Sequence, residues 1–369
     1  MSQSTRTAGQ WWTAKGESTT VSLAKTRDLA IALLQQAGAN DEDAAFIADI
    51  HLAKALQGDH ERGMTMLVDQ IRAARSGELR LTATVRVLRD HGATALVAAD
   101  EGDSPKLVCR AAMHLAIRKA QEFGVGCVSA QAKAELLTPF IEQAVAAGMV
   151  TMILAQGIPL VAPYGGVTPL LGNAPVGWGI PAGRNPAVIA DMSLTQTSAK
   201  GVVNAARQGE PVPPGFILDP EGHPTTDPSQ FVDPQWLQQG KTVARGSLVP
   251  IGDSHKSYAL VFVAGLLTSM LAGGDFAWQL GNDAPAPGKF SSVFIVIDPA
   301  AFGDRDAMLA RVDEYIEHLR GSQRREGVPQ ILYPGERSQA LKRSRAKADA
   351  LELPVEQYAA LVALRGGFR

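Results

Sequence analysis

A short charged segment stands between two glycines early in the chain: Gly58-Asp59-His60-Glu61-Arg62-Gly63. Histidine exchanges a proton near neutral pH, so His60 is a candidate proton donor. Arg62 keeps its proton at any ordinary pH and is instead a candidate ligand for a carboxylate, which its guanidinium can bind through two parallel hydrogen bonds. The alternative is that Asp59, His60, Glu61 and Arg62 form only a solvated cluster at the start of a helix.

A lysine offers a second candidate acid or base. Lys133 follows the apolar segment GVGCVSA (124–130), where a strand is expected. A lysine that is buried near other cations loses its proton readily and can then take part in proton transfer. The competing interpretation is an exposed lysine just before a helix.

Hydroxyl and basic side chains also stand at the expected starts of two helices. Ser193 and Thr195 precede a helix expected over 197–209, and Lys256 precedes the apolar run 258–272. The N-terminus of a helix presents unpaired N–H groups and positive potential, so it can hold phosphate oxygens. Lys256 opposes the helix dipole, which a bound anion would explain. The alternatives are simple N-capping for the two hydroxyls and a solvated surface position for Lys256.

The apolar periodicity predicts alternating helices and strands. Helices are expected over 22–38, 41–57, 64–74, 105–124 and 197–209, and strands over 85–90, 93–100, 124–130, 149–156, 187–195 and 291–299. This alternation predicts a mixed α/β fold. A Rossmann fold would need G-x-G-x-x-G between a strand and a helix, whereas Gly124-Val125-Gly126 lacks the third glycine and leads into a strand. A bound dinucleotide would therefore need another architecture.

Two segments with little charge have different expected roles. Residues 156–186 are rich in glycine and proline, and an irregular segment of this length inside a compact chain is usually functional. The apolar run 258–272 is too short to cross a bilayer. We therefore expect it to form a buried core helix.

Composition and spacing exclude several classes of function. The 35 basic and 37 acidic residues give a net charge of -2, which indicates neither a nucleic acid nor an anionic membrane as a partner. The histidines and the two cysteines show no H-x-x-x-H or C-x-x-C spacing, so no metal site is expected. The N-terminal segment lacks the apolar core of a secretory signal, and the two cysteines suit reduced thiols, so a cytoplasmic location is expected.

Four stretches taken together resemble a known family. They are VAPYGGVTPLLGNAP (161–175), IADMSLTQTSAKG (189–201), GEPVPPGFILDPEGHPTTDP (209–228) and GSLVPIGDSHKSYALVFVAGLLTSMLAGG (246–274). In order and spacing they are similar to signatures of the type-2 malate/L-lactate dehydrogenases, which include ureidoglycolate, sulfolactate and piperideine-carboxylate type reductases. The resemblance implies a non-Rossmann nicotinamide-binding fold, a homodimer, and reduction of a small 2-oxo acid or imino acid by NADH or NADPH.

The resemblance also implies where the cofactor lies and how the chain is divided. The cofactor-binding residues would be Asp191, Met192, Ser193, Leu194, Thr195, His255, Lys256, Gly335 and Glu336. We expect a mobile leader over 1–20, a helical domain from both termini (21–80 with 335–369), a cofactor-binding domain (81–123 with 185–334) and a smaller domain (124–184) that holds the Gly/Pro-rich loop.

The chain departs from this family where the chemistry should be. The family motif G-x-D-S-H-G becomes the segment 58–63, in which Glu61-Arg62 replace Ser-His and His60 replaces Asp. Lys133-Ala134-Glu135 stand where the family has H-F-G. The turn G-T-N-P becomes 172–175, in which Asn173 can still offer an amide to the substrate or cofactor. Because three motifs change while the scaffold signatures stay, the pattern favours a changed substrate or reaction over random decay.

Three functional hypotheses follow. The first is an NAD(P)-dependent oxidoreductase with an atypical site, in which Arg62 and Glu61 contact a small carboxylate substrate and His60 or Lys133 delivers the proton. The second is a non-redox lyase or hydrolase on the same scaffold that uses Glu61, Arg62 and Lys133. The third is a non-catalytic homologue.

Overall fold

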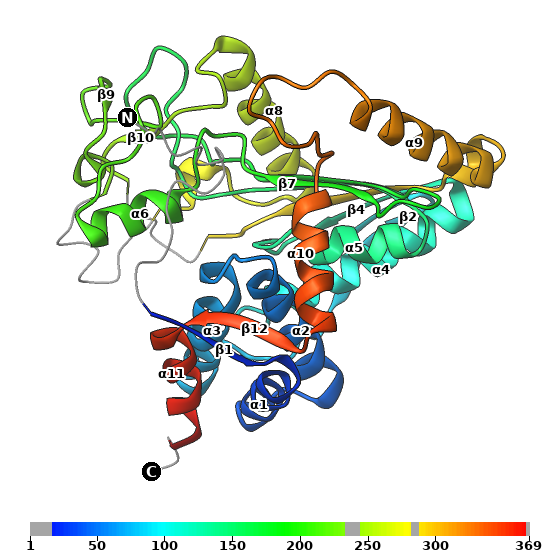
Figure 1. The fold of residues 1–369 in the computed structure, drawn as a ribbon, viewed down its shortest axis with the longest axis horizontal. Helices are drawn as coiled ribbons and strands as arrows, with labels where there is room; N and C mark the ends of the chain where they lie inside the picture. The colour runs from blue at the N-terminus through cyan, green and yellow to red at the C-terminus, as the bar shows by residue number, and fades with distance from the viewer. Residues whose placement is uncertain (1–16, 233–243, 282–287, 367–369) are drawn as a thin grey trace.

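A seven-stranded mixed sheet forms the centre of the molecule (Figure 1). The computed structural model describes residues 17–232, 244–281 and 288–366. Along the sheet the order is β2 (Arg86–His91), β3 (Thr94–Ala98), β4 (Val125–Ala130), β11 (Ser292–Ile297), β5 (Val150–Ala155), β6 (Val176–Ile180) and β7 (Val188–Met192). The β3–β4 pair is parallel and the other neighbours are antiparallel. The strands expected over 85–90 and 93–100 form the hairpin β2–β3, which turns at His91-Gly92.

Helices cover both faces of this sheet (Figure 1). On one face, α4 (Pro105–Phe123) packs on β3, β4 and β11, and α5 (Thr138–Ala146) packs on β5, β6 and β7. On the other face, α8 (His255–Ala272) packs on β4, β5 and β11. The approach of α4 is close, because a Cβ on Gly126 would lie 2.1 Å from the carbonyl oxygen of Ala116. A further helix, α9 (Arg305–Arg320), follows β11.

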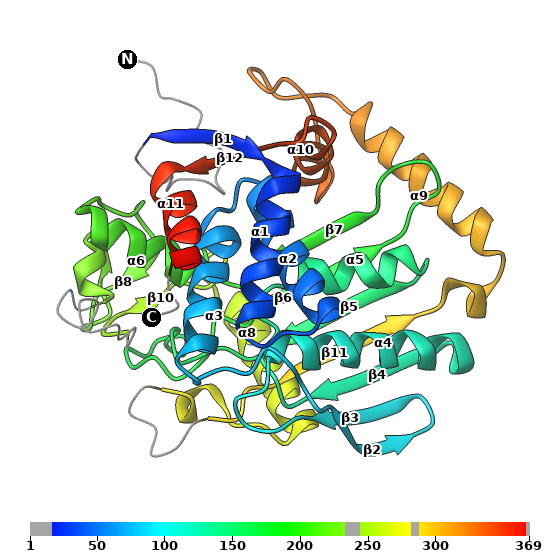
Figure 2. The ribbon, with the colours of Figure 1, turned by 90° about the horizontal axis from the view of Figure 1, so that it is seen from below.

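The two ends of the chain build a separate helical layer with its own apolar core (Figure 2). Its helices are α1 (Leu23–Gln36), α2 (Asp41–Leu56), α3 (Met66–Arg75), α10 (Glu336–Lys347) and α11 (Val355–Ala363). The N-terminal strand β1 (Ser18–Ser22) pairs antiparallel with the C-terminal strand β12 (Ala350–Pro354). The expected leader therefore extends too far, since 18–20 belong to a paired strand. The rest of it, up to residue 16, lies outside the described residues.

A third cluster surrounds α6 (Ala199–Gln208) and a small sheet. That sheet has the order β10 (Ser247–Leu248), β8 (Ile217–Leu218) and β9 (Pro224–Thr225). Short 3₁₀ turns occur at Pro228–Gln230, Ala277–Gln279, Pro299–Phe302 and Leu364–Gly366, and a π-helical turn at Glu61–Thr65. The division into a cofactor-binding domain (81–123 with 185–334) and a smaller domain (124–184) remains a prediction. Strands from both expected domains join the one central sheet.

The expectation that 258–272 is a buried core helix is wrong. Only one face of α8 packs on the sheet, and apolar side chains on the opposite face are open to solvent, with Leu260 60%, Val263 49% and Met270 59% exposed. By length and composition alone α8 would also pass as a membrane span, but a helix of a soluble protein passes the same test. An apolar run indicates that burial of the helix from water is favourable, but it does not indicate which surface covers the helix.

Candidate functional site

The charged segment 58–63 forms an irregular turn that presents Glu61 and Arg62. It includes the π-helical turn Glu61–Thr65, and such turns are frequent at functional sites. Gly63 is required there, because a Cβ would lie 2.9 Å from the backbone nitrogen of Ala55. The buried ring of His51 holds the turn through Nδ1, 2.8 Å from the carbonyl oxygen of Arg62. Helical periodicity predicted only an ordinary helix from residue 64.

Arg62 is paired within its own turn and also faces the other charged groups of the site. The carboxylate of Asp59 accepts from the backbone nitrogen of Arg62 (3.1 Å) and from its Nη1 (3.0 Å). Its side chain remains 38% exposed. Its positive charge acts on Asp191 and on Lys200, which places the guanidinium beside the connection between β7 and α6.

Glu135 lies among lysines from three parts of the chain. Lys106 Nζ, in the first turn of α4, is 3.1 Å from Glu135 Oε2, and Lys133 Nζ is 3.9 Å from Oε1. Burial alone would raise the pKa of Glu135, but Lys106 and then Lys133 outweigh it and lower the pKa to about 2. Glu135 is therefore a permanent carboxylate, and Lys200 acts on it as well.

Lys200 belongs to this cluster although the sequence reasoning passed over it. It lies in the first turn of α6, where Ser198 is the N-cap. Its pKa is lowered, chiefly by burial, and the charges acting on it come from Glu135, Arg62, Glu61 and Asp59. The argument that singled out Lys256 applies equally here, since a lysine at a helix N-terminus opposes the dipole.

These charged side chains are partly open to solvent. Glu135 keeps 30% of its side-chain surface, Lys133 keeps 35%, and Lys200 is exposed. The charges of Lys106, Lys133 and Lys200 act on Glu135, and the charge of Arg62 acts on Lys200. We call these four cations the cationic cleft.

The carboxylate of Asp191 accepts hydrogen bonds from neighbouring parts of the protein. Its Oδ2 accepts from Lys54 Nζ (3.1 Å) and from the backbone nitrogen (3.0 Å) and hydroxyl (2.5 Å) of Thr138. Burial raises the pKa of Asp191, but Lys54 and the Thr138 hydroxyl outweigh it, so the pKa lies below its usual range. The group links β7 to α2 of the helical layer and to the start of α5.

The remainder of the 191–195 segment divides into accessible and interior residues. Met192 is 43% exposed, and Ser193 is half-buried. Leu194 and Thr195 are buried, and Thr195 Oγ1 lies 2.8 Å from the carbonyl oxygen of Thr197 and 3.0 Å from Ser193 Oγ. Met192 and Ser193 are thus the members of the expected cofactor segment that can contact a ligand without rearrangement.

His60 lies apart from the cationic cleft. Burial and then Arg345, from the helical layer, lower its pKa, and Glu352 also acts on it. Its buried Nδ1 has no hydrogen-bond partner among the described residues. Burial raises the pKa of Glu61, whereas the positive charges of Lys200 and Arg207 on α6 act to lower it. Glu61 and Arg62 act on Lys200, whereas the charges of Arg345 and Glu352 act on His60, and Lys133 contacts Glu135. The roles expected of these residues remain predictions.

The turn Pro334-Gly335-Glu336 lies against β7. The carbonyl oxygen of Pro334 accepts from the backbone nitrogen of Ile189 (3.1 Å). Gly335 has a φ of 87°, and a Cβ there would lie 2.7 Å from the carbonyl oxygen of Ile189. The carboxylate of Glu336 is occupied by Arg320 (2.6 Å) and by the backbone nitrogen of Tyr333 (3.2 Å).

At the start of α8, Ser254 and Ser257 form a capping box that leaves His255 and Lys256 exposed. The His255 ring lies 6.3 Å from the ring of Tyr164. Tyr164, Ser254 and Tyr258 line a hollow of about 100 Å³ beside this helix start.

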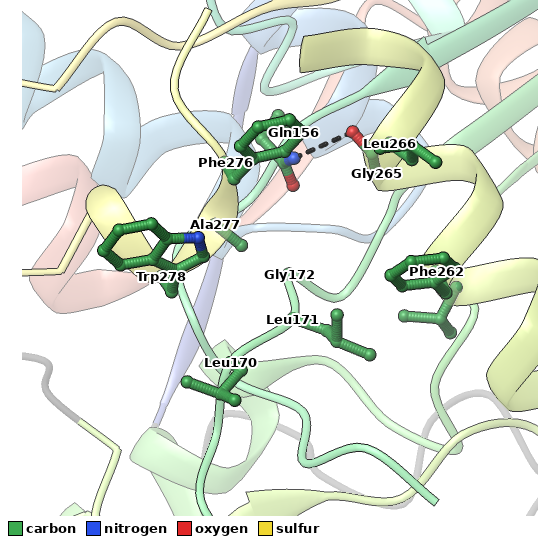
Figure 3. A pocket seen from close by; sticks show the side chains of 11 residues that line it. Gln156, Leu170, Leu171, Gly172, Phe262, Gly265, Leu266, Phe276, Ala277 and Trp278 are labelled. Carbon is green, nitrogen blue, oxygen red and sulfur yellow. Dashed lines mark hydrogen bonds between the residues drawn. The ribbon is translucent and has the colours of Figure 1, made fainter. Parts of the chain in front are cut away.

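The turn at 172–175 borders a larger cavity of about 210 Å³ (Figure 3). Its walls are mostly apolar and include Phe276 and Trp278, while Gln156 donates through Nε2 to the carbonyl oxygen of Gly265 (3.0 Å). The backbone carbonyl of Asn173 accepts from Leu194 (3.1 Å), which ties this turn to the segment after β7. No group of three or more metal-ligating side chains occurs among the described residues.

Comparison with known proteins agrees with this fold. The family model for malate/L-lactate dehydrogenase matches residues 21–362. The chain belongs to the malate/L-lactate dehydrogenase family. It is 32% identical over 318 residues to the L-sulfolactate dehydrogenase of Methanothermobacter thermautotrophicus, covering 85% of this chain and 87% of that protein.

Two further members of the malate/L-lactate dehydrogenase family extend the comparison. The (2R)-3-sulfolactate dehydrogenase (NADP(+)) of Chromohalobacter salexigens is 31% identical over 344 residues, 90% of this chain and 94% of that protein. The crystal structure of delta1-piperideine-2-carboxylate reductase from Pseudomonas syringae superposes with a TM-score of 0.77 at 26% identity, covering 94% of this chain and 99% of that chain. The chain is thus related to dehydrogenases and reductases over nearly its whole length.

Proposed function

We propose that this protein is an NAD(P)-dependent oxidoreductase that reduces a small 2-oxo acid or imino acid in the cationic cleft. The observation that supports this most directly is the gathering of positive charge near one accessible carboxylate, Glu135. Lys106 and Lys133 lie 3.1 Å and 3.9 Å from it, and Lys200 acts on it as well. Relatives named for 2-hydroxy acids and for a cyclic imino acid give the substrate class.

The cleft is suited to an anionic substrate. Glu135 stays charged and would repel a carboxylate, but Lys106, Lys133 and Lys200 outweigh it. Arg62 uses Nη1 for Asp59, and no hydrogen bond of its Nη2 is found with the described residues. A substrate carboxylate can accept a hydrogen bond from this second edge of the guanidinium, and the positive charge of the lysines attracts it. Glu61, next to Arg62 in the chain, would then also face the bound acid.

The residues after β7 fit a nicotinamide dinucleotide. Ser198 caps the backbone nitrogen of Gly201, so the N–H groups of Ala199 and Lys200 point out of the helix, toward a phosphate. Met192 and Ser193 lie accessible at the end of β7, and Lys256 lies exposed at the start of α8. When bound, the reduced cofactor would supply the hydride.

We also propose that the protein is a homodimer and that it is cytoplasmic. The exposed apolar face of α8 continues into Phe276 and Trp278, which are 39% and 62% exposed. An apolar surface of this extent is typical of a subunit interface. From Ser257 to Ala272 the helix has no charged residue, as expected for a face that is covered by a second copy.

The direct test is turnover. Purified protein is mixed with NADH or NADPH and a panel of 2-oxo acids, sulfonated 2-oxo acids and cyclic imino acids, and the loss of absorbance of the reduced nicotinamide is followed. We expect turnover with at least one acid and none when the carboxylate is replaced by an amide. Absence of turnover and of any thermal shift with either cofactor would contradict the proposal.

One observation favours the non-redox alternative. Burial raises the pKa of Glu61, and a raised carboxyl pKa beside Arg62 and Lys200 suits an acid–base pair in a lyase or hydrolase step. Substrate loss without any change in the nicotinamide absorbance would favour this alternative.

A further inference from the structure

A buried histidine of α2 holds the turn that presents Arg62. The His51 side chain is fully buried, and its Nδ1 lies 2.8 Å from the carbonyl oxygen of Arg62. This oxygen belongs to the π-helical turn Glu61–Thr65, in which the backbone nitrogen of Thr65 donates to the carbonyl oxygen of His60 (3.3 Å), five residues back. The ring thus bonds to the backbone of the residue that is proposed to bind the substrate carboxylate.

The two ring nitrogens of His51 face two oxygen atoms. Nε2 lies 3.1 Å from Oε1 of Gln70, which belongs to α3. Burial and then the charge of Lys106 lower the pKa of His51 to about 4, so the ring is neutral at neutral pH. A neutral imidazole donates from one nitrogen and accepts at the other. Because a carbonyl oxygen can only accept, Nδ1 carries the proton and Nε2 needs a donor.

Gln70 can supply that donor. Its Nε2 is buried and has no hydrogen-bond partner among the described residues, whereas its Oε1 faces a ring nitrogen that also accepts. A half-turn of the side-chain amide exchanges these two atoms. Nε2 of Gln70 then donates to Nε2 of His51, and both ring nitrogens are paired. The amide thereby favours the proton of His51 on Nδ1, the nitrogen that faces the carbonyl oxygen of Arg62.

We propose that His51, held by Gln70 in the form that carries its proton on Nδ1, is a positioning residue for Arg62. The inference rests on the proposed function, in which Arg62 binds the substrate carboxylate. His51 is fully buried and acts only through the backbone. Asp59 accepts from the backbone nitrogen of Arg62 (3.1 Å), and His51 donates to its carbonyl oxygen, so both of its backbone polar groups are held. The guanidinium therefore starts from a fixed backbone before the substrate arrives, and less conformational entropy is lost on binding.

Two substitutions of His51 test the bond to the Arg62 carbonyl. His51→Asn keeps an N–H donor at the same number of bonds from Cβ as Nδ1, whereas His51→Leu keeps an apolar side chain without a donor. We expect His51→Leu to raise KM for the acid about tenfold, with kcat and the KM for NADH or NADPH changed by less than about threefold. His51→Asn should stay within about threefold of the wild type in all three constants.

Thr26→Val is the matched control, because it removes a buried hydrogen bond from the same helical layer. The buried Thr26 hydroxyl donates to the carbonyl oxygen of Ser22 (2.7 Å) at the start of α1, which is not part of the turn at 58–63. We expect this variant to lose stability in urea unfolding, as His51→Leu does, but to keep the KM of the wild type. A KM that rises equally in both variants would make His51 a structural residue only and would overturn the proposal.

A second measurement does not depend on activity. In protein with ¹⁵N-labelled histidine, long-range correlation of the carbon-bound ring protons with the ring nitrogens shows which nitrogen carries the proton. The signals of His51 are assigned by their absence in His51→Asn. We expect a neutral ring with its proton on Nδ1 between about pH 5 and 8. A ring with its only proton on Nε2, or an imidazolium, in this range would overturn the proposal.

The outcomes are distinguishable. If the wild type turns over but His51→Leu keeps the KM of the wild type, or His51→Asn raises KM as much as His51→Leu, the positioning role is wrong and the proposed function stands. If the wild type oxidises neither cofactor with any acid, the proposed function fails and the positioning role fails with it. Each variant is assayed at a temperature at which thermal unfolding shows it to be folded, so a change in KM is not a loss of folding.

Discussion

The buried contact between Lys54 and Asp191 allows a prediction about stability in which the magnitude can be worked out. Lys54→Met keeps the length of the side chain and removes the charge that neutralises Asp191. Breaking a buried ion pair by removing one partner costs about 3–5 kcal/mol. The Lys54 and Asp191 side chains retain 10% and 21% of their surface, and Thr138 still donates to Asp191. We therefore expect the lower end, a loss of about 3 kcal/mol in the free energy of unfolding.

Urea unfolding at neutral pH measures this loss, and a double-mutant cycle assigns it to the pair. Asp191→Asn removes the charge that Lys54 neutralises, so Lys54→Met and Asp191→Asn together should cost at least about 1 kcal/mol less than the sum of the two single changes. Lys25→Met, at an exposed position of α1, should change the stability by less than about 0.5 kcal/mol. Additive single changes, or a Lys54→Met variant as stable as this control, would refute the reasoning.

The same pair predicts a pH dependence with a definite sign. The pKa of Asp191 is lowered in the folded state, so its contribution is complete above the unfolded pKa and is lost as the pH falls through the folded pKa. The wild type should therefore lose its advantage over Lys54→Met as the pH falls below about 4. A difference in stability that stays constant down to the acid transition would contradict this assignment.

The remaining predictions concern the substrate, a loop and the interface. Arg62→Lys should raise KM about tenfold or more with a smaller effect on kcat, because the flat second edge of the guanidinium is lost; an unchanged KM would remove Arg62 from the substrate site. Asp313→Ala should cost about 3 kcal/mol in urea unfolding, since this buried carboxylate accepts from the backbone nitrogens of Arg184 (2.6 Å) and Asn185 (2.9 Å), and a loss below about 1 kcal/mol would contradict this. The wild type should be a dimer in light scattering, and Leu260→Glu combined with Met270→Glu should convert it to a monomer; a monomeric wild type would contradict the proposed interface.

Much of the scaffold could be predicted from the sequence, because each element has a local signal. The apolar runs at 124–130, 149–156 and 291–299 became β4, β5 and β11, adjacent strands at the centre of the sheet. The four family signatures were sufficient to predict the fold that the family model confirms over 21–362. Periodicity and register along one segment are properties that a sequence displays directly.

The site was predictable only in part, because it depends on which distant segments meet. Arg62, Glu135 and Lys200 are separated by 60 residues or more in the chain, and only the fold brings the charges of Arg62 and Glu135 within range of Lys200. Lys54 and Lys106 stand in apolar helices and gave no sign of their buried partners. The exposed face of α8 was missed for a related reason, since composition does not distinguish a core from a surface that another chain covers.

The π-helical turn at Glu61–Thr65 was missed for a different reason. It depends on the close contact of Gly63 with Ala55 and on the bond between His51 and the carbonyl oxygen of Arg62, neither of which periodicity reports. This turn directs Glu61 toward α6 and separates it from the side chain of His60. The assignment of His60, Glu61 and Arg62 to the site by alignment to the family motif remains a prediction.

The claim that this cleft transfers a hydride is tested most directly by isotope transfer. NADH and NADPH deuterated at C4 on either face are incubated with the protein and each 2-oxo or imino acid of the panel, and the product acid is analysed by mass spectrometry. The account predicts that one deuterium, from one face only, appears in the reduced acid. A reduced acid without deuterium, or a consumed acid that is not reduced, would contradict it.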